Sequence, residues 1–549
     1  MYVIGISSGL KHGHHDGGAV LMKDGEIIAA SEEERFTLAK HARGELPRGT
    51  ISYCLRHAGI RIEDVSFVCS PLQTYENYDR RITDYLKFHF GHSPKVELYD
   101  HHMCHAASSY FVSGFSEATV VCVDNSGDSS SGGIFHGKGN NLNSVVRFER
   151  HNSLGLYYGM MTQFLGYQMT NDEYKVMGLA SYGQPEFEDK FDSILKSTEL
   201  GFTFNQDLDK RLRDAEIYTS DFSTRQERIF TETLEEILGP RRLPGEPLNE
   251  RFKNIAASAQ ARLERVLVEL VGSATQRTGS TNVCLAGGVA LNCKANMEIK
   301  TRNGLTNMYV PPVPHDAGVA LGAAILKQVE FGHEIAPMMH GYWGPEYGED
   351  DIRNRLEQIG ASFTDCDDPV EKCVPDLHEG RTVGWFQGRM EFGPRALGNR
   401  SIIAHPGLAG MKDKINSSIK YREEFRPFCP SVNEEAQSRY FSDADHLPFM
   451  NVTVNGQANA TSEISSVMHI DGTARIQTVR EESNPLFHRL ISEFAKAGGP
   501  EVLLNTSLNI NEQPTTNSPL EALHTFFCSG MEVLYLGPFR VHKPQFERA

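Results

Sequence analysis

The chain has 549 residues, more than one hydrophobic core usually supports, so we expect at least two domains. Its 54 basic and 71 acidic residues give a net charge of −17, which argues against polyanionic partners such as nucleic acid. Ten cysteines are scattered without a Cys-x-x-Cys pair, as is typical of a reducing compartment, and we expect a soluble, cytoplasmic protein. No apolar run approaches the roughly 18 residues of a membrane span, and the N-terminus lacks the pattern of a signal peptide. No internal repeat is evident in the sequence.

The N-terminal residues predict a strand, a glycine-containing loop and a β-hairpin. Strands are expected at 3–7, 17–22 and 27–30, the last two joined by a tight Asp-Gly turn. The loop between the first two strands carries His15 next to Asp16, a pair that could serve as a general base beside a carboxylate. A surface loop with an incidental histidine would have the same composition.

His101 and His105 are four residues apart in a histidine-rich segment. In a helix they would share one face, where two imidazoles can reach one metal ion, although a solvated surface is the plainer interpretation. The apolar run 119–123 predicts a buried strand that ends in Asp124, and open α/β sheets bind ligands at that end of their strands. Asp316 is a further candidate ligand. Two imidazoles and two carboxylates suit Fe, Zn or Mn better than Ca or Mg.

Two glycine-containing segments predict contacts with an anion. The loop 125–133 is rich in hydrogen-bond donors, and 283–292 predicts a strand, a Gly-Gly turn and a helix whose N-terminus could face a phosphate. A flexible turn or glycine packing would explain either segment as well. Residues 337–351 contain glycine and proline and break the periodicity, so we expect the domain boundary there, with domains at 1–345 and 346–549.

The second domain contains a local excess of positive charge. From residue 381 to residue 426 there are nine basic and four acidic residues. Arginines flanked by Gly, Pro and Phe are expected to be partly buried and therefore paired, either with phosphate or in a structural ion-pair network. Nearer the C-terminus, a strand at 502–504 runs into Asn505 and Ser507, which could contact a nucleotide or simply end the strand in a turn.

Together these segments resemble the NodU/TobZ family of O-carbamoyltransferases over essentially the whole chain. The resemblance rests on seven motifs in order: His15-Asp16 with 32–36, 101–108, 172–180, 285–292, 389–400, 425–428 and 504–507. It implies an α/β fold with an N-terminal domain of the actin/hexokinase type, similar to the tRNA threonylcarbamoyl transferases, and a C-terminal domain that resembles YrdC.

The resemblance implies a reaction in two stages. The C-terminal domain would form carbamoyl adenylate from carbamoyl phosphate and ATP, with release of pyrophosphate and phosphate. The N-terminal domain would then transfer the carbamoyl group to a hydroxyl of a small-molecule acceptor, a secondary metabolite or a glycan, with release of AMP.

Matched residue by residue, the resemblance assigns His15 as the base that takes the proton from the attacking hydroxyl. It places a divalent metal ion, expected to be Fe(II), on His101, His105, Asp124 and Asp316. It assigns contacts with the nucleotide and with carbamoyl phosphate to Arg395, Lys420, Arg426, Asn505, Ser507, Gly127, Gly287, Gly288 and Asn292.

The chain departs from the family pattern in two loops. Asn125 follows the predicted ligand Asp124 where the family usually has glycine, and residues 37–41 differ from the usual Thr-Arg-x-Lys-His. Both loops lie where an acceptor could enter, so the acceptor's identity stays open, as does the choice between a monomer and a homodimer. Two other functions are considered: a tRNA threonylcarbamoyl-adenosine synthase fusion, which the net charge disfavours, and a non-catalytic nucleotide-binding module, which the retained candidate residues disfavour.

Overall fold

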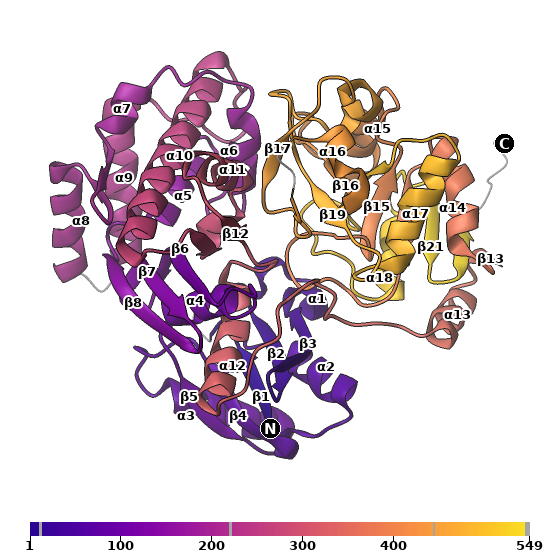
Figure 1. Ribbon diagram of the computed structural model, residues 1–549, viewed down its shortest axis with the longest axis horizontal. Helices are drawn as coiled ribbons and strands as arrows, with labels where there is room; N and C mark the ends of the chain where they lie inside the picture. The colour runs from indigo at the N-terminus through magenta and orange to yellow at the C-terminus, as the bar shows by residue number, and fades with distance from the viewer. Residues whose placement is uncertain (10–13, 219–221, 443–444, 544–549) are drawn as a thin grey trace. The chain divides into compact units, whose positions relative to one another are not determined.

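The computed structural model describes residues 1–9, 14–218, 222–442 and 445–543 (Figure 1). By its internal contacts the chain divides into two compact units: the first combines Met1–Ser66 with the C-terminal part from Met338, and the second is Phe67–Pro337. Both units contain sheets and helices, so the predicted α/β class is confirmed. The domain boundary at 345/346 stays a prediction.

The N-terminal strands of the first unit form an antiparallel meander. They are β1 (Tyr2–Ile6), β2 (Gly18–Lys23) and β3 (Glu26–Glu32). The turn between β2 and β3 has positive φ at both central residues, Asp24 and Gly25, as the Asp-Gly pair predicts. Helix α2 (Arg48–Ala58) packs against this meander with its apolar face and ends at a left-handed Gly59.

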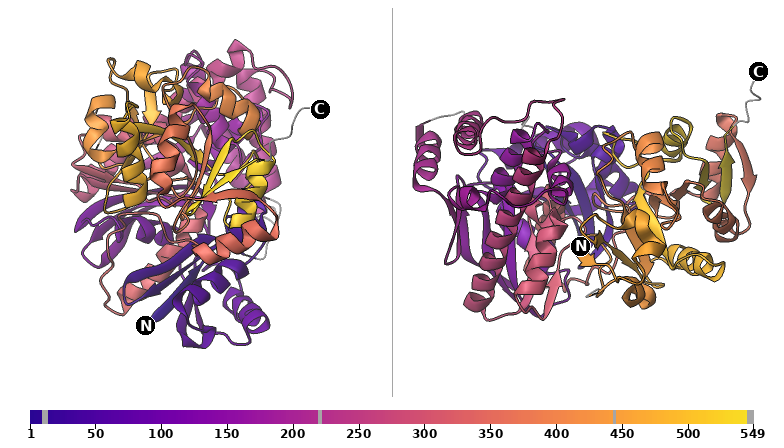
Figure 2. Two further views of the ribbon diagram at one scale, coloured as in Figure 1. Left: turned by 90° about the vertical axis from the view of Figure 1, so that its right-hand side faces the viewer. Right: turned by 90° about the horizontal axis from the view of Figure 1, so that it is seen from above.

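The rest of the first unit is built on an eight-stranded sheet. Its order is β13 (Ser362–Asp365), β22 (Phe539–His542), β21 (Val533–Leu536), β14 (Val383–Phe386), β15 (Arg400–Ala404), β20 (Val502–Ser507), β16 (Cys429–Asn433) and β19 (Gln477–Val479). Successive residues point to opposite faces: Ile402 packs on one face and Ile403 on the other. Helices α14 (Pro369–His378) and α17 (Pro485–Lys496) cover the Ile403 face, and α13 (Glu349–Gln358), α15 (Met411–Ile415) and α18 (Pro519–Phe527) cover the Ile402 face (Figure 2).

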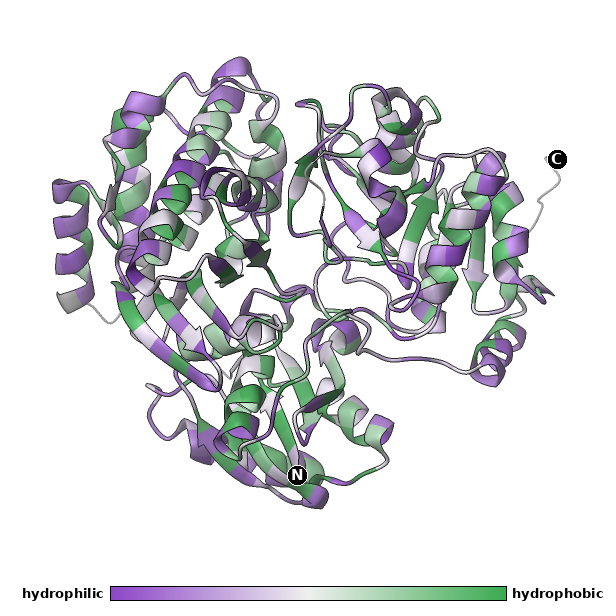
Figure 3. Ribbon diagram, viewed as in Figure 1, coloured by the Kyte–Doolittle hydropathy of each residue, from purple (hydrophilic) through white to green (hydrophobic). Residues whose placement is uncertain are grey.

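The second unit has a five-stranded sheet at its centre. Its order is β12 (Asn307–Tyr309), β11 (Asn282–Ala286), β6 (Glu117–Gly127), β7 (Ser130–Lys138) and β8 (Asn141–Glu149). Helix α4 (His101–Tyr110) packs on this sheet through Ala106 and Tyr110, and α12 (Val319–Glu330) packs on α4. Helices α5 (Leu154–Phe164) and α10 (Glu250–Thr278) also contact β6. In Figure 3, hydrophobic residues concentrate on the strands, while polar residues cover much of the outer helices.

One succession of strands occurs twice in the chain. The antiparallel meander β1–β3 is followed by a parallel pair, β4 (Val65–Ser70) and β5 (Lys95–Leu98). The antiparallel meander β6–β8 is likewise followed by strands in parallel pairing, β11 and β12. No repeat is evident in the sequence because only the order and direction of the strands recur.

The remaining elements complete the two units. Those of the first are α1 (Glu34–Thr37), η1 (Lys40–Ala42), η2 (Ile62–Asp64), η5 (Asn416–Lys420), η6 (Glu434–Ala436), α16 (Gln437–Tyr440), β17 (Thr453–Asn455), η7 (Thr461–Val467) and β18 (Thr473–Arg475). Those of the second are α3 (Tyr78–Phe90), α6 (Glu173–Ala180), α7 (Glu188–Asp192), β9 (Leu195–Thr198), β10 (Gly201–Phe204), α8 (Gln206–Tyr218), α9 (Phe222–Leu238), η3 (Gly288–Leu291), α11 (Cys293–Arg302) and η4 (Asp316–Gly318). Among the described residues, no helix combines the length and apolar character needed to cross a membrane.

Candidate functional site

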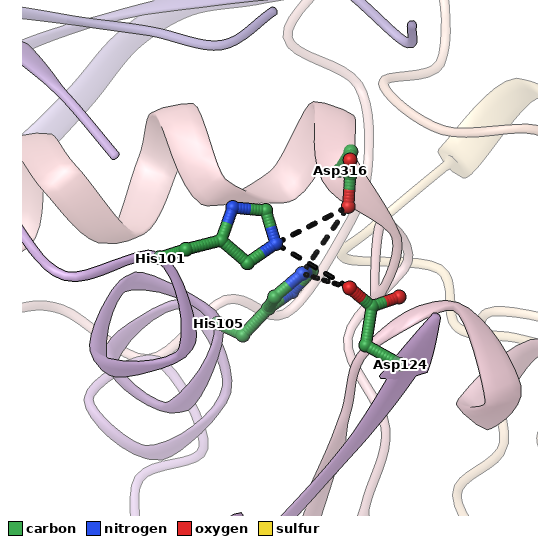
Figure 4. Close-up of side chains that lie close together, drawn as sticks. All are labelled: His101, His105, Asp124 and Asp316. Carbon is green, nitrogen blue, oxygen red and sulfur yellow. Dashed lines mark hydrogen bonds and ion pairs between the residues drawn. The ribbon is translucent and has the colours of Figure 1, made fainter. Parts of the chain in front are cut away.

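The four predicted metal ligands converge in the second unit (Figure 4). His105 Nε2 lies 3.3 Å from Asp316 Oδ1 and 3.7 Å from Asp124 Oδ2, and His101 Nε2 lies 3.6 Å and 3.4 Å from the same two atoms. A tetrahedron with metal–ligand bonds of about 2.1 Å has edges of about 3.4 Å. The donor atoms therefore have the spacing of a tetrahedral metal site.

The N-terminus of α4 holds the two histidines in place. Asp100 is the N-cap residue, and its carboxylate accepts a hydrogen bond of 2.9 Å from the backbone N–H of Met103. The backbone N–H of His101 donates to Asp128, whose other carboxylate oxygen accepts from the backbone and hydroxyl of Thr74. These bonds satisfy N–H groups that a helix leaves without partners, and they set the position of its first turn.

A glycine turn positions Asp124, which lies three residues before the end of β6. Gly287 has a φ of +86°, and a Cβ atom there would lie 2.2 Å from the carbonyl oxygen of Val123, so only glycine fits. The turn directs the backbone N–H of Gly288 to Asp124 Oδ1 at 3.1 Å. Gly127 lies against the ring of His101, where a Cβ atom would come within 2.1 Å of Cδ2. These three glycines, predicted to contact a nucleotide, thus all border the candidate metal centre.

The electrostatics of the cluster also suit a cation. Burial by itself would raise the pKa of Asp124, but hydrogen bonds from the two imidazoles hold it well below its usual range. Burial lowers the pKa of His101, and the carboxylates of Asp316 and Asp124 reverse this effect and raise it well above its usual value. Nδ1 of His101 and of His105 has no hydrogen-bond partner within the described part of the chain. The residues fit a divalent metal ion, and the choice among Fe, Zn and Mn stays a prediction.

Asn292 is placed beyond this cluster, at the start of α11. Its side chain accepts from the backbone N–H of Ala295 and exchanges two hydrogen bonds of 3.0 Å with Gln260. Gln260 in turn accepts a hydrogen bond of 2.6 Å from Tyr158. The described contacts of Asn292 are those of a helix cap, and its assigned nucleotide contact stays a prediction.

In the first unit, the structure joins His15 to its neighbouring carboxylate. His15 Nδ1 lies 2.7 Å from Asp16 Oδ2. Asp16 has a φ of +55°, a left-handed conformation in which its side chain can turn back to the preceding imidazole. The imidazole and the carboxylate expected from the sequence are therefore in contact, and the role of His15 as a base stays a prediction.

Lys420 lies in the core of the first unit beside the end of β20. Its ammonium group donates to the backbone oxygen of Ser507 at 2.5 Å and to the side chain of Asn509 at 2.7 Å. Burial lowers the pKa of Lys420 well below its usual value, and the charges of Arg422 and Arg426 lower it further. A buried lysine flanked by arginines is a good position for an anion, because an anion would offset this mutual repulsion.

Asn505 lies on β20, two residues before Ser507. Its amide nitrogen donates to Ser431, Gln477 and the backbone oxygen of Ala396, and its Oδ1 is buried with no hydrogen-bond partner among the described residues. An unsatisfied buried acceptor is costly, which makes Oδ1 a candidate contact for a ligand donor. Arg395, next to Ala396, and Arg426 are both half-buried, and the charge of Arg426 acts on Lys420. The assigned contacts of the two arginines with an anion stay predictions.

Two other arginines of this basic region have structural roles. Arg389 donates to the backbone oxygens of Ile28, Trp343 and Gly344. Arg400 donates to four backbone oxygens and stacks on Phe386, 3.6 Å from the ring centre, and burial lowers its pKa to about 10. These two arginines therefore have structural roles, but they act through backbone oxygens, whereas the sequence predicted a phosphate or an ion-pair network.

The sequence did not point to Glu391, which organises the loop that carries Arg395. Its Oε1 accepts hydrogen bonds from three backbone N–H groups, those of Leu397, Asn399 and Arg400, at 2.8 to 3.1 Å. The sequence did contain a clue: Glu391 is a carboxylate within a run rich in glycine and proline. The backbone N–H groups of such a loop have no partners in a helix or sheet, so a carboxylate can accept their hydrogen bonds. Glu32 and Arg35 of the 32–36 motif contact the same loop, both through the backbone of Gly393.

Fold and site together define an α/β protein with a candidate metal centre in one unit and a buried lysine near two arginines in the other. Residues 7–90 and 72–325 match the family model "Carbamoyltransferase N-terminus", and residues 374–543 match "Carbamoyltransferase C-terminus". The chain belongs to the carbamoyltransferase family and is a transferase enzyme, as the motifs predicted.

Named relatives agree with this assignment. Nodulation protein NolNO of Sinorhizobium fredii is 34% identical over 588 residues, covering 99% of this chain and 83% of the relative. Nodulation protein NolO of Bradyrhizobium diazoefficiens is 38% identical over 453 residues, covering 81% and 79%. The 3'-hydroxymethylcephem-O-carbamoyltransferase of Amycolatopsis lactamdurans is 36% identical over 233 residues, covering 42% and 43%.

Proposed function

We propose that the chain is an ATP-dependent O-carbamoyltransferase that works in two stages. The observation that carries the proposal is the presence of two chemically different sites, one in each unit. The positive charge gathered at Lys420, Arg422 and Arg426 would suit reactants that carry phosphate, and the cluster around Asp124 would suit a divalent metal ion. A relative's name, 3'-hydroxymethylcephem-O-carbamoyltransferase, supports a hydroxyl group as the acceptor.

In the first stage, carbamoyl phosphate and ATP would react to give carbamoyl adenylate, with release of pyrophosphate and phosphate. Both reactants are anionic, so bringing them together requires positive charge in a site that excludes water. Lys420, Arg395 and Arg426 would supply this charge. Asn505 and Ser507 would contact the adenylate, with Oδ1 of Asn505 available to a donor group.

In the second stage, an acceptor hydroxyl would attack the carbamoyl carbon. The oxygen of the hydroxyl forms a bond to that carbon while its proton passes to His15, and the bond from the carbon to the AMP oxygen breaks with AMP keeping the electron pair. Asp16, 2.7 Å from Nδ1 of His15, stabilises the imidazolium that results.

His101, His105, Asp124 and Asp316 would hold the metal ion, which we expect to be Fe(II). When bound, the ion supplies positive charge that can orient a phosphate and stabilise a leaving AMP. Gly127, Gly287 and Gly288, which border the cluster, would contact the nucleotide through their backbone, and Asn292 would contact it from the start of α11. Nδ1 of each of these histidines is buried without a hydrogen-bond partner among the described residues, so no bond at Nδ1 orients the ring. The carboxylates and the surrounding packing would orient it instead.

For the fold, we propose an actin/hexokinase-type domain at 1–345 and a YrdC-like domain at 346–549. The repeated succession of an antiparallel meander and a parallel strand pair supports the first assignment, because a duplicated unit of this kind is expected of that fold. We further propose a cytoplasmic location, a small-molecule acceptor, and no nucleic-acid or membrane partner, in keeping with the net charge of −17.

The first experiment measures pyrophosphate and AMP release from ATP and carbamoyl phosphate, each reactant omitted in turn. If the release of pyrophosphate and AMP requires both reactants, the result supports carbamoyl adenylate chemistry. If neither product is released, the result contradicts the proposal. Lys420→Ala should abolish pyrophosphate release while the protein stays folded, and His15→Asn should spare it and slow AMP release. Lys414→Ala is the matched control, since this lysine pairs with Glu532 at the surface. Equal loss of both products in the His15 variant would contradict the two-site scheme.

A further inference from the structure

The carboxylate beside His15 holds a second imidazole. Asp16 Oδ1 lies 2.7 Å from Nδ1 of His41, as Oδ2 lies 2.7 Å from Nδ1 of His15. The two rings are 6.3 Å apart between centroids and nearly perpendicular, at 76°. Side-chain exposure is 13% for Asp16, 22% for His41 and 26% for His15, so the group is mostly covered yet reachable.

The backbone around this group adopts conformations that most residues avoid. Asp16, His41 and Ala42 have φ values of +55°, +65° and +39°. The N–H of Asp16 donates to the carbonyl oxygen of His41 at 2.7 Å, and the N–H of His41 donates to Glu34 at 2.6 Å. Strained residues persist where the surrounding contacts demand them, and they concentrate at functional sites. Here the strain brings both imidazoles to one carboxylate.

The chemistry of the contact fixes the tautomers. An ionised carboxylate can only accept hydrogen bonds, so both Nδ1 atoms carry hydrogen and each neutral ring has its lone pair on Nε2. This is the tautomer that a base acting through Nε2 requires. Because one oxygen of Asp16 is bonded to His15 and the other to His41, the carboxylate cannot rotate away from His15 without breaking its bond to His41.

We propose that His41 is a positioning residue for carbamoyl transfer, which through Asp16 holds His15 in its productive tautomer and orientation. The inference rests on the proposed function, in which His15 takes the proton of the attacking hydroxyl. In that step His41 exchanges no proton with the substrate. It keeps the carboxylate aimed at the imidazolium that forms on His15.

The test uses the full chain with ATP and carbamoyl phosphate, and water as the acceptor. First-turnover pyrophosphate reports adenylate formation, and AMP release reports attack on the carbamoyl carbon. His41→Gln places its amide nitrogen near the former Nε2, away from Asp16, and should lower the rate constant for AMP release about 10-fold or more. First-turnover pyrophosphate and the KM for ATP should not change.

Two further variants separate positioning from a general structural role. His41→Asn places its amide nitrogen near the former Nδ1 and should recover most of the rate that His41→Gln loses. His57→Gln, at an exposed histidine that packs on Tyr53, should change neither product. Thermal unfolding of each variant checks that it is folded. Equal rates for the Asn and Gln variants would overturn the proposal.

A double-mutant cycle completes the test. If His41 acts through His15, then adding His41→Gln to His15→Asn should cause no further loss of AMP release. Losses that multiply in the double variant would overturn the proposal. Its failure is distinguishable from failure of the proposed function, in which the wild-type chain would form no pyrophosphate from ATP and carbamoyl phosphate.

Discussion

Alanine at position 127 tests whether the cluster of two histidines and two aspartates binds a metal ion. A Cβ atom on Gly127 would lie 2.1 Å from Cδ2 of His101 and 2.6 Å from its Nε2. Ordinary contacts of a Cβ atom begin near 3.4 Å, so the ring of His101 would have to retreat by more than about 1 Å. His101 is 4% exposed, and such a shift takes its Nε2 out of the cluster.

The displacement is large on the scale of metal coordination. Metal–ligand distances are held to within about 0.2 Å, so a shift of this size removes one of four ligands. We expect Gly127→Ala to weaken metal affinity at least about 100-fold, which corresponds to about 2.7 kcal/mol. Competition with a chelator under anaerobic conditions measures the affinity for Fe(II), and the visible spectrum of bound Co(II) reports the number of ligands.

The control is Gly201→Ala in the same unit, where the nearest atom to the new Cβ is 3.4 Å away and φ is not in the left-handed region. It should bind metal as the wild-type chain does. Wild-type affinity in Gly127→Ala would refute the reasoning, since it would mean that His101 is no ligand and that the cluster is only an ion-pair network.

Two other predictions concern the first unit. Asp376→Ala removes a buried carboxylate that receives two hydrogen bonds from Arg540, at 2.7 and 2.9 Å. In denaturant titrations it should lower the free energy of unfolding by about 3–5 kcal/mol. The control Glu357→Ala, on an exposed helix face, should change this free energy by about 0.5 kcal/mol or less. Glu391→Ala leaves three backbone N–H groups of the Arg395 loop without their acceptor. Because this would displace the loop, the KM for ATP in the pyrophosphate assay should rise. An unchanged KM would show that the loop does not depend on this carboxylate.

Local patterns in the sequence were enough to predict several features. The four-residue spacing of His101 and His105 places both side chains on one face of α4 because a helix has 3.6 residues per turn. The apolar run before Asp124 predicts a buried strand, as β6 is, although the strand continues past the carboxylate to Gly127. The Asp-Gly pair at 24–25 predicts a hairpin turn because these residues tolerate positive φ. Each of these depends on neighbours within a few residues.

Other features depend on contacts between residues far apart in the chain. Arg389 and Arg395 have similar sequence surroundings, yet Arg389 is bound to backbone oxygens of Ile28 and Trp343, a role visible only once β3 and the 343–345 segment lie beside it. His41 is 25 residues from Asp16, and only the strained turn after α1 brings its ring to the carboxylate.

Side-chain chemistry and short spacings are local properties, and they were enough to indicate candidate ligands, bases and anion contacts. Which of these residues meet depends on the packing of distant parts of the chain. Asp316 reaches His105 across more than 200 residues because the packing of α12 on α4 brings η4, which directly precedes α12, to the histidines. Long-range packing is a property of the whole core, and no short stretch of sequence contains it.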